Sequence, residues 1–402
     1  MRVAYVTMQF PAPSETFAAV EVRALRARGV EVDVYGLRRP HPRHAAMLRE
    51  RGLDPVRIKH LSVSRALRGL LDGMLAPHRV LYLIILVLRH VRPTSERLKS
   101  LALLPIVLRI DAEARQGRYD MVHLFWGHYP ALVGTLLQRF GPSPPVSIFL
   151  GAYDLHRAYG PSALVARRAS HVWTHAAVNA RDIEALGVAC ERVRVVYRGV
   201  DLPAIDALSL RADGRVTGRV VTAGRLIASK GTERALRAFA LLRERVPGAT
   251  LTVFGDGPEQ PALEAAAKAL GVDGAVRFAG HVAHGAVIAA LAEAEAFVLL
   301  SSKPDERLPN VVKEAMACGV VCVVSRTPGI DELVEHGRSG FVVDAHDVGS
   351  AADALATVLA GGPGIEEVRK RARTHIEARF AASASAATLA SAWSKSAAGR
   401  TA

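Results

Sequence analysis

The sequence contains very little cysteine. Its 402 residues include only Cys190, Cys318 and Cys322, so an even-numbered disulfide framework is excluded. Such scarcity favours a reducing compartment, where thiols stay free. We therefore expect a cytoplasmic protein with three buried free thiols.

The sequence also lacks a long hydrophobic run. The longest is LYLIILVL, residues 81–88, whereas a helix needs about 20 apolar residues to span a bilayer. The opening MRVAYVTMQF has one basic residue and a short β-like run, without a long apolar core or a small-residue cleavage site. We predict neither a membrane-spanning helix nor a signal peptide.

Acidic residues are scarce in the first half of the chain. Residues 1–199 contain 29 Lys and Arg against 15 Asp and Glu, which accounts for the net charge of +14, whereas residues 200–402 contain 23 of each. This asymmetry indicates an anionic partner for the first half: a membrane, a nucleic acid or a phosphorylated substrate. A basic surface that only improves solubility is the alternative.

Strand-like runs alternate with helical patterns along most of the chain, which is typical of doubly wound parallel sheets. Residues 2–7, 15–29 and 30–36 predict a strand, a helix and a strand, and the series starts again at residues 219–224. We therefore predict an α/β fold with two Rossmann-like doubly wound domains.

The two halves meet at residues 198–214, which are polar and aperiodic. We place the first domain at residues 1–199 and the second at residues 200–370. Residues 371–402 predict C-terminal helices that return to the first domain.

Residues 58–110 depart from this alternation. They predict long helices with an apolar face beside a basic face, and they contain nine Lys and Arg against Asp72 and Glu96. Such helices suit the surface of an anionic bilayer. Helices packed on the core with basic outer faces explain the pattern equally well. Nucleic acid is disfavoured, because the segment has few aromatics and no nucleic-acid-binding motif.

A diphosphate site is indicated by TAGRLIASKG, residues 222–231. Gly224 and Arg225 follow a strand, and Lys230 stands at the start of the next helix. A guanidinium, an ammonium and helix N-terminal amides can together bind phosphate oxygens.

The next strand is followed by FGDGP, in which Gly255 and Gly257 allow close backbone approach to a ligand. A tight packing turn is the simpler explanation of these two glycines taken alone.

Two glutamates flank a predicted helix start in ERLPNVVKEAMACG. Pro309 suits the first helical position, so the backbone around Leu308, Pro309, Asn310 and Val311 offers an anion site. Glu306 lies just upstream, over whatever the phosphate carries. Glu314 lies about one turn inside, where its carboxylate can accept from a vicinal diol such as a ribose.

These blocks resemble the nucleotide-sugar domain of glycosyltransferase family 4, the retaining glycosyltransferases of GT-B fold. GRLIASKG, FGDGPE, VRFAGHV, PNVVKEAMACG and TPGIDELVEHGRSGFVV occur in the family's order, and Glu306 and Glu314 match its E-x7-E motif. FPAPSETF and YRGVDL are similar to the exopolysaccharide branch, the colanic-acid-type transferases. The resemblance covers nearly the whole chain, and residues 37–118 match least.

The resemblance implies a hexosyltransferase that needs neither a metal nor a cofactor and takes a UDP- or GDP-sugar as donor. The expected transfer retains the anomeric configuration by a front-face displacement. The implied roles are the donor diphosphate for Arg225 and Lys230, the ribose for Glu314, the transferred sugar for Glu306, and the base for the backbone near Gly255 and Val282. Glu306, Arg225 and Lys230 are the expected catalytic residues.

The sequence departs from the family in the first domain. In FLGAYDL, Gly151 stands where many members have a histidine, and Asp154 is retained. His123 and His128, after another strand, are the candidate replacements on the acceptor or sugar side. No glycine-rich loop follows the first strand, so Ser14 and Thr16 are the candidates for donor contact there.

We therefore expect a glycosyltransferase of polysaccharide biosynthesis. Its partners are a nucleotide-sugar, a glycan, lipid-linked or small-molecule acceptor, and an anionic membrane contacted through residues 58–110, with no nucleic acid. The location is cytoplasmic, or peripheral at the cytoplasmic membrane face. A catalytically silent nucleotide-sugar-binding protein and a nucleotide-sugar epimerase on the same fold are the alternatives.

Overall fold

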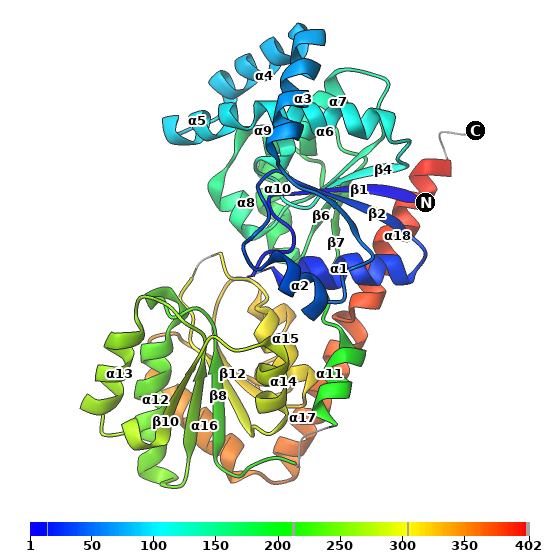
Figure 1. The fold of residues 1–402 in the computed structure, drawn as a ribbon. Coiled ribbons are helices and arrows are strands. Elements are labelled where there is room, and N and C mark those ends of the chain that lie inside the picture. Colours follow the sequence, from blue (N-terminus) through cyan, green and yellow to red (C-terminus); the bar gives the residue numbers. More distant parts are fainter. Residues whose placement is uncertain (14, 211–213, 304, 399–402) are drawn as a thin grey trace. The chain divides into compact units, whose positions relative to one another are not determined.

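The computed structural model describes residues 1–13, 15–210, 214–303 and 305–398. The chain forms two compact units (Figure 1). Unit 1 consists of Met1–Gly199 and helix α18 (Ala382–Ala398), and unit 2 of Val200–Ala381. Each has a parallel sheet between helices, which confirms the prediction of two Rossmann-like doubly wound domains.

The unit 1 sheet has seven strands in the order β3-β2-β1-β4-β5-β6-β7, all parallel. Alternate residues of β1 face opposite layers. Ala4 and Val6 face α4, α6 and α7, whereas Val3 and Tyr5 face α1 and α18. The strands are β1 (Arg2–Thr7), β2 (Glu31–Gly36), β3 (Arg57–Lys59), β4 (Met121–Leu124), β5 (Val146–Phe149), β6 (His171–Thr174) and β7 (Val193–Val195).

The helices of unit 1 before α18 include four consecutive ones, α3 to α6, between β3 and β4. The patterns predicted to be long helices break at Ala76 and Leu103, each just ahead of a proline in the first turn of the next helix. The helices are α1 (Thr16–Ala27), α2 (His44–Glu50), α3 (Val63–Leu75), α4 (Pro77–His90), α5 (Thr94–Ala102), α6 (Leu104–Gln116), α7 (Pro130–Arg139), α8 (Ala152–Arg157), α9 (Gly160–Ala166) and α10 (Ala180–Ala185).

The unit 2 sheet has six parallel strands in the order β10-β9-β8-β11-β12-β13. Its core lies between the sheet and α12, α13, α16 and α17. The strands are β8 (Arg219–Ala223), β9 (Thr250–Phe254), β10 (Val276–Gly280), β11 (Ala296–Leu299), β12 (Val321–Ser325) and β13 (Phe341–Val343); the helices are α11 (Leu202–Ser209), α12 (Thr232–Arg245), α13 (Gln260–Ala269), α14 (His284–Ala292), α15 (Asn310–Ala317), α16 (Val348–Ala360) and α17 (Pro363–Arg379).

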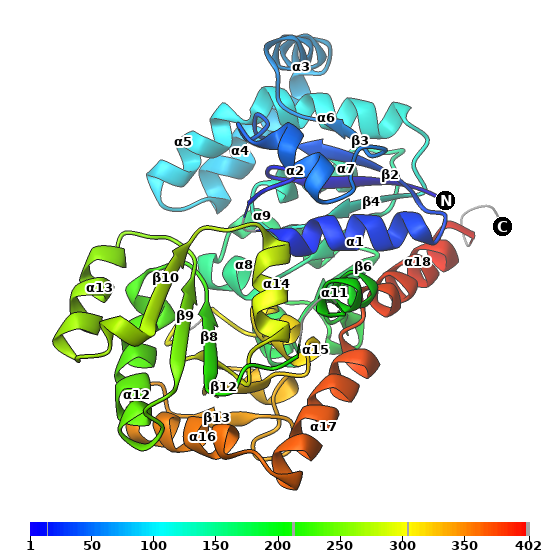
Figure 2. The same ribbon diagram turned by 60° about the horizontal axis from the view of Figure 1, so that its bottom comes forward.

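The C-terminal helices divide between the units. Ile365 and Val368 of α17 pack into the unit 2 core, and unit 2 extends to Ala381, so residues 371–381 do not belong to the returning segment that the sequence indicated. Only α18 returns to unit 1, where it packs along α1 (Figure 2). Its Trp393 is fully buried, and the indole Nε1 donates to Ser147 Oγ at 3.1 Å.

Two further expectations concern thiols and membrane spans. The expectation of three buried thiols is wrong for Cys190, which is exposed on a short 3-10 turn; Cys318 is partly buried and Cys322 buried. Among the described residues, no single helix is long and apolar enough to cross a membrane. Helices α3 and α4 pass that test only as a pair, and they are bent by 104°.

Candidate functional site

The strand order of unit 2 reverses between β8 and β11. At such a switch point the loops after the two strands diverge and leave room for a ligand at the carboxyl edge of the sheet. Lys230 follows β8 and Glu306 follows β11, and the Lys230 Nζ donates to Glu306 Oε1. Residues 76 positions apart in sequence thus form one ion pair.

This ion pair is largely shielded from water. The side chain of Lys230 is 18% exposed and that of Glu306 10% exposed. The second carboxylate oxygen, Glu306 Oε2, is buried and has no hydrogen-bond partner among the described residues. Buried acceptors are nearly always satisfied in folded proteins, so Glu306 Oε2 is suited to accept a hydrogen bond from a ligand hydroxyl.

Helix α15 begins at Asn310 with Pro309 as its N-cap, so the helix starts one residue after the predicted position. Its first backbone bond runs from the Val312 amide to the Pro309 carbonyl, at 3.1 Å. The amides of Asn310 and Val311 lie ahead of that bond, where helix amides have no intrahelical partner. The same end carries the positive partial charge of the helix, and the preceding Leu308 is buried.

Glu314 lies on α15 with its carboxylate mostly buried. Its Oε1 is 3.0 Å from Nε2 of His284, the first residue of α14. The half-exposed His284 was missed from the sequence. The sequence signal for His284 was weak, because it is only a histidine two positions after Val282. Val282 is partly exposed in the loop after β10, and nothing in that loop indicates a contact with α15.

Arg225 and Gly224 lie on the loop after β8. The side chain of Arg225 is exposed, and a Cβ built on Gly224 would lie 3.8 Å from the Lys230 stem. Arg225 and Lys230 therefore belong to the same short loop, as the diphosphate prediction requires.

Gly255 and Gly257 pack against that loop. A Cβ on Gly255, whose φ is +118°, would lie 1.9 Å from the Gly224 oxygen, and one on Gly257 would lie 2.3 Å from the Leu226 oxygen. The Leu226 amide also donates to the Asp256 carbonyl at 2.8 Å. These contacts support the tight packing turn; contact with a nucleotide base stays a prediction.

A second polar cluster lies in unit 1, where the strand order reverses between β1 and β4. His128 follows β4, and its Nδ1 is 3.0 Å from Oδ1 of Asp154 on α8. The other oxygen of the buried Asp154 accepts the Gly151 amide at 2.9 Å. The structure thus brings together two of the predicted acceptor-side residues.

Glu15 and Arg198 belong to the same region, and sequence reasoning missed both. Burial raises the pKa of Glu15, partly offset by the nearby Arg198 guanidinium. The buried Arg198 lies 4.0 Å from the Phe149 ring centroid and 4.5 Å from those of Phe17, Phe125 and Trp126. Burial lowers its pKa, opposed mainly by the charge of Glu21.

Gly151 has no room for the histidine that the family pattern would place there. A Cβ on Gly151 would lie 2.8 Å from Cζ3 of Trp126. The indole therefore occupies the space beside this position, and a larger side chain requires it to move.

Of the remaining candidates of unit 1, His123 lies in the core. His123 is fully buried beside the Tyr5 and Trp393 rings, 3.0 Å from Ser147 Oγ, and burial lowers its pKa to about 3. This environment is that of a core residue. Thr16 is the first residue of α1 and is partly buried. Ser14 lies outside the described residues.

Residues 217–376 match the family model described as glycosyl transferases group 1. A glycogen synthase of Mycobacterium tuberculosis is 31% identical over 219 residues, which cover 54% of this chain and 52% of the relative. The amylovoran biosynthesis glycosyltransferase AmsK of Erwinia amylovora is 25% identical over 94% of this chain and 96% of its own. The chain spans about half the length of the first of these relatives.

Among solved structures, Anabaena Alr3699/HepE in complex with UDP aligns with a TM-score of 0.72 at 19% identity, over 98% of this chain and 100% of that one. The same protein has also been solved with UDP-glucose. The likeness confirms the GT-B fold, and the sequence matches are to a glycosyl transferase family model and to a glycosyltransferase of polysaccharide biosynthesis.

Proposed function

We propose that this protein is a retaining hexosyltransferase of glycosyltransferase family 4, in the colanic-acid-type exopolysaccharide branch. The substrate is a UDP- or GDP-sugar, and the acceptor is a glycan, a lipid-linked sugar or a small molecule. The proposal rests chiefly on the Lys230–Glu306 ion pair at the switch point of unit 2. The UDP and UDP-glucose held by the structural neighbour support the choice of donor class.

In this proposal two cations bind the leaving diphosphate. Arg225 supplies a planar fork and Lys230 a mobile ammonium, and together with the amides of Asn310 and Val311 they stabilise the negative charge that develops on the diphosphate. These two cations can supply the charge that a divalent metal provides in other transferases. The proposed transfer therefore needs no metal and no cofactor besides the nucleotide-sugar.

The two glutamates bind opposite ends of the donor. Glu306 already uses Oε1 to hold Lys230, which leaves Oε2 for a hydroxyl of the transferred sugar. Glu314 binds the ribose diol, either beside its contact with His284 or by displacing that contact. The front-face displacement needs no protein nucleophile, because the acceptor oxygen bonds directly to the anomeric carbon as the bond from that carbon to the diphosphate breaks. It needs no protein base, because the leaving diphosphate takes the acceptor proton.

Unit 1 holds the acceptor in this proposal. Its excess of basic residues suits an anionic acceptor such as a lipid-linked sugar diphosphate. His128, held by Asp154, supplies the imidazole that is absent at Gly151. The cellular location that goes with such an acceptor is the cytoplasm, at its face of the membrane.

Matched variants test the donor site. Glu314→Ala removes the ribose contact, and we expect donor affinity, measured by calorimetry, to fall about tenfold. Glu306→Gln keeps the size but removes the charge, and we expect turnover to fall about 100-fold with little change in donor affinity. Lys268→Gln, on the exposed face of α13, is the control. Unchanged affinity and turnover in both glutamate variants would refute the proposal.

Two product assays test the mechanism. Retention predicts that the first-formed glycoside has the anomeric configuration of the donor in NMR, and metal independence predicts full activity in EDTA. An inverted product, or activity that EDTA abolishes and a divalent cation restores, would overturn the respective claim.

One observation favours a second candidate, a catalytically silent nucleotide-sugar-binding protein. Trp126 fills the space beside Gly151, where the family pattern has a sugar-contacting histidine. Donor binding without transfer or hydrolysis, across a panel of acceptors, supports this candidate over the transferase. The same incubations reveal an epimerase by isomerisation of the donor sugar without acceptor.

A further inference from the structure

Helix α3 presents its apolar face to solvent. Its large apolar residues recur at helical spacing, which places them on one side. Six such side chains are exposed, and the exposed fraction reaches 76% for Met74 and 86% for Leu75. The residues are Val63, Leu67, Leu70, Leu71, Met74 and Leu75. A helix of a soluble monomer normally turns such a face inward.

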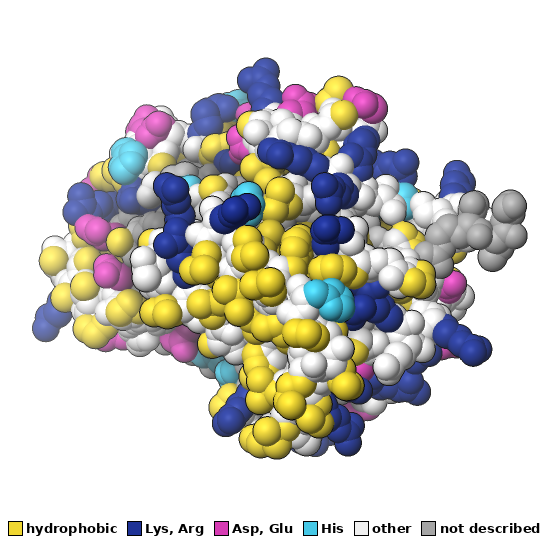
Figure 3. Space-filling view, turned by 90° about the horizontal axis from the view of Figure 1, so that it is seen from above, with side chains coloured by type: hydrophobic (Ala, Val, Ile, Leu, Met, Phe, Trp, Pro, Cys, Tyr) yellow, Lys and Arg dark blue, Asp and Glu magenta, His cyan; other side chains and the backbone are white. Residues whose placement is uncertain are grey.

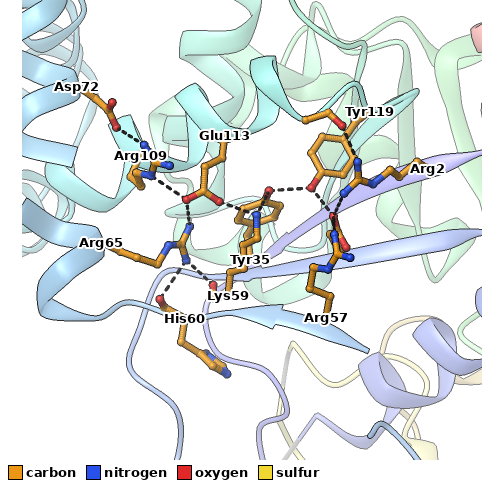
Figure 4. A network of polar contacts seen from close by, with 12 residues as sticks. Arg2, Tyr35, Arg57, Lys59, His60, Arg65, Asp72, Arg109, Glu113 and Tyr119 are labelled. Atoms are coloured by element: carbon orange, nitrogen blue, oxygen red, sulfur yellow. Dashed lines mark hydrogen bonds and ion pairs between the residues drawn. The ribbon is translucent and has the colours of Figure 1, made fainter. Parts of the chain in front are cut away.

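The inner face of α3 is made of glycine and charged residues. Gly69 and Gly73 are its buried residues, and a Cβ on Gly69 would lie 1.8 Å from the Pro105 oxygen of α6. Arg65 bonds Glu113 at 3.2 Å and Asp72 bonds Arg109 at 3.3 Å, both across to α6 (Figure 4). The helix is thus anchored on the outer side of α6 (Figure 2) with its leucines pointing away.

Helices α4 and α5 extend the exposed apolar surface. Leu83, Leu86 and Val87 hold α4 to the unit 1 core, while the opposite side of α4 and one residue of α5 remain exposed. We call the six α3 residues together with Leu81, Ile85, Leu88 and Leu98 the docking face. It holds ten of the sixteen large hydrophobic side chains exposed on the described chain. Figure 3 shows this face as a band of apolar side chains bordered by Lys and Arg.

The charges around the docking face are of one sign. Arg68, Arg89, Arg92 and Lys99 are exposed. The only two carboxylates in residues 61–103, all of which are described, are engaged: Asp72 with Arg109, and the buried Glu96 with Lys99 at 2.9 Å. No exposed acidic residue therefore opposes an anionic partner within this segment.

Further positive charge lies at the junction of α3 and α6. A cavity of about 720 Å³ there is lined by five Lys and Arg side chains and a single carboxylate, Glu113. Glu113 contacts Lys59 at 2.9 Å, Arg65 at 3.2 Å and Arg109 at 2.8 Å. Arg109 also pairs with Asp72, so three cations share two carboxylates. Figure 4 shows this surplus of positive charge.

We propose that the docking face binds the surface of an anionic phospholipid bilayer, with the α3 leucines in the acyl boundary and the cations at the headgroups. Apolar side chains beside cations match the two layers of such a surface. A second copy of the chain is disfavoured, because a two-fold contact would bring like charges together. Nucleic acid is disfavoured, because its phosphates would face leucine rather than arginine. This proposal does not depend on the proposed transferase activity.

Vesicle sedimentation with the full chain tests the proposal. We expect binding to vesicles with about one third phosphatidylglycerol and weak binding to pure phosphatidylcholine. The variant Leu71→Gln/Met74→Gln/Leu75→Gln should bind at least tenfold more weakly, because it removes apolar area from the most exposed part of α3. All three positions are exposed, so the substitutions leave the core of unit 1 intact.

Charge variants separate the two contributions. Arg68→Gln/Arg89→Gln/Arg92→Gln should reduce binding to phosphatidylglycerol vesicles and weaken its dependence on salt near ~0.1 M. Two matched controls from unit 2 should bind like the wild type: Leu210→Gln/Val216→Gln/Leu270→Gln and Lys268→Gln/Arg326→Gln/Arg338→Gln, all at exposed positions.

Three results would overturn the proposal. One is equal vesicle binding by the leucine variant and the wild type. Another is a concentration-dependent dimer that the leucine variant dissolves, without vesicle binding, which assigns the face to a second copy. The third is absence of vesicle binding together with a salt-dependent shift of a generic oligonucleotide.

Discussion

Asp154 makes two contacts at the carboxyl edge of the unit 1 sheet. One oxygen faces His128 Nδ1 and the other accepts the Gly151 amide. Because an ionised carboxylate can only accept, Nδ1 of a neutral His128 carries the proton and Nε2 is left as the acceptor. The imidazole is therefore fixed in both orientation and tautomer, as a group that accepts a hydrogen bond from a sugar hydroxyl must be.

If His128 replaces the missing histidine, its removal should affect turnover more than donor binding. We expect His128→Asn to lower turnover about 100-fold and to leave donor affinity unchanged. Asp154→Asn should lower turnover less, because the imidazole remains but its tautomer is no longer fixed. The exposed His156→Asn on α8 is the control. Wild-type turnover in His128→Asn would contradict this role.

His123 predicts acid sensitivity of unit 1. Burial lowers its pKa from 6.5 to about 3 in the folded protein, so below pH 6.5 the unfolded chain binds a proton that the native state refuses. Protonation of this histidine therefore leaves the free energy of unfolding unaffected above pH 6.5. The free energy decreases as the pH falls from 6.5 towards 3, by up to ~1.4 kcal/mol per pH unit.

In His123→Asn the slope of the unfolding free energy against pH should therefore be smaller, by the equivalent of up to one proton taken up on unfolding. Tryptophan fluorescence in denaturant measures it, because the three tryptophans, Trp126, Trp173 and Trp393, all belong to unit 1. The same variant near pH 7 gives the separate cost of the lost packing and of the Ser147 contact. Identical slopes in variant and wild type would contradict the prediction.

At the scale of elements, the seat of α3 on α6 depends on glycine. A methyl group at Gly69 would meet the Pro105 backbone oxygen, and backbone cannot give way as a flexible side chain can. We expect Gly69→Ala to lower the unfolding free energy of unit 1 by ~1–3 kcal/mol despite its better helix propensity.

The matched control is Gly285→Ala on α14, where a Cβ meets only Leu208 side-chain atoms at 3.7 Å or more. Helix propensity alone acts there, so the protein should be unchanged or stabilised by up to ~1 kcal/mol. A neutral or stabilising Gly69→Ala would show that α3 shifts on α6 without penalty.

Local sequence signals predicted the start of α15 well, because Pro309 constrains its own φ and lacks an amide donor. The prediction of one long helix across α3 and α4 is wrong, because the chain turns by 104° between them. Amphipathic spacing identified an apolar and a basic face on α3, but only packing decides which face meets the protein. Here the glycines decide, by allowing contact with the Pro105 backbone.

The site residues show the same contrast between local sequence signals, which predict well, and packing between distant elements, which the sequence does not indicate. Arg225, Lys230 and Glu306 were predicted from motifs that surround strand ends, and the Lys230–Glu306 pair then followed from the order of the strands. His284 and Arg198 were missed because each acquires its neighbours from distant elements. Arg198 is surrounded by four aromatic rings from α1, β5 and the loop after β4, and nothing in YRGVDL indicates them.

At the scale of the whole molecule, each unit has its own hydrophobic core. Trp393 belongs to unit 1, although unit 2 separates it from the rest of that unit in the sequence. We expect Trp393→Ala to lower the unfolding free energy of unit 1 by ~3–5 kcal/mol and to leave the unfolding of unit 2 unchanged.

Fluorescence of the remaining tryptophans reports unit 1, and circular dichroism reports both units. The exposed Lys395→Ala on the same helix is the control and should behave like the wild type. A single transition that shifts as a whole in Trp393→Ala would show that the two cores unfold together.

The return of α18 to unit 1 also sets an order for biosynthesis. Domains generally fold as they emerge from the ribosome, with the earlier one first. In this chain every residue of unit 2 is translated before the helix that delivers Trp393 to the core of unit 1. Until α18 has been translated, the first segment of unit 1 therefore exposes the hydrophobic surface that Trp393 later covers. We expect chaperones to bind nascent chains that are arrested before α18.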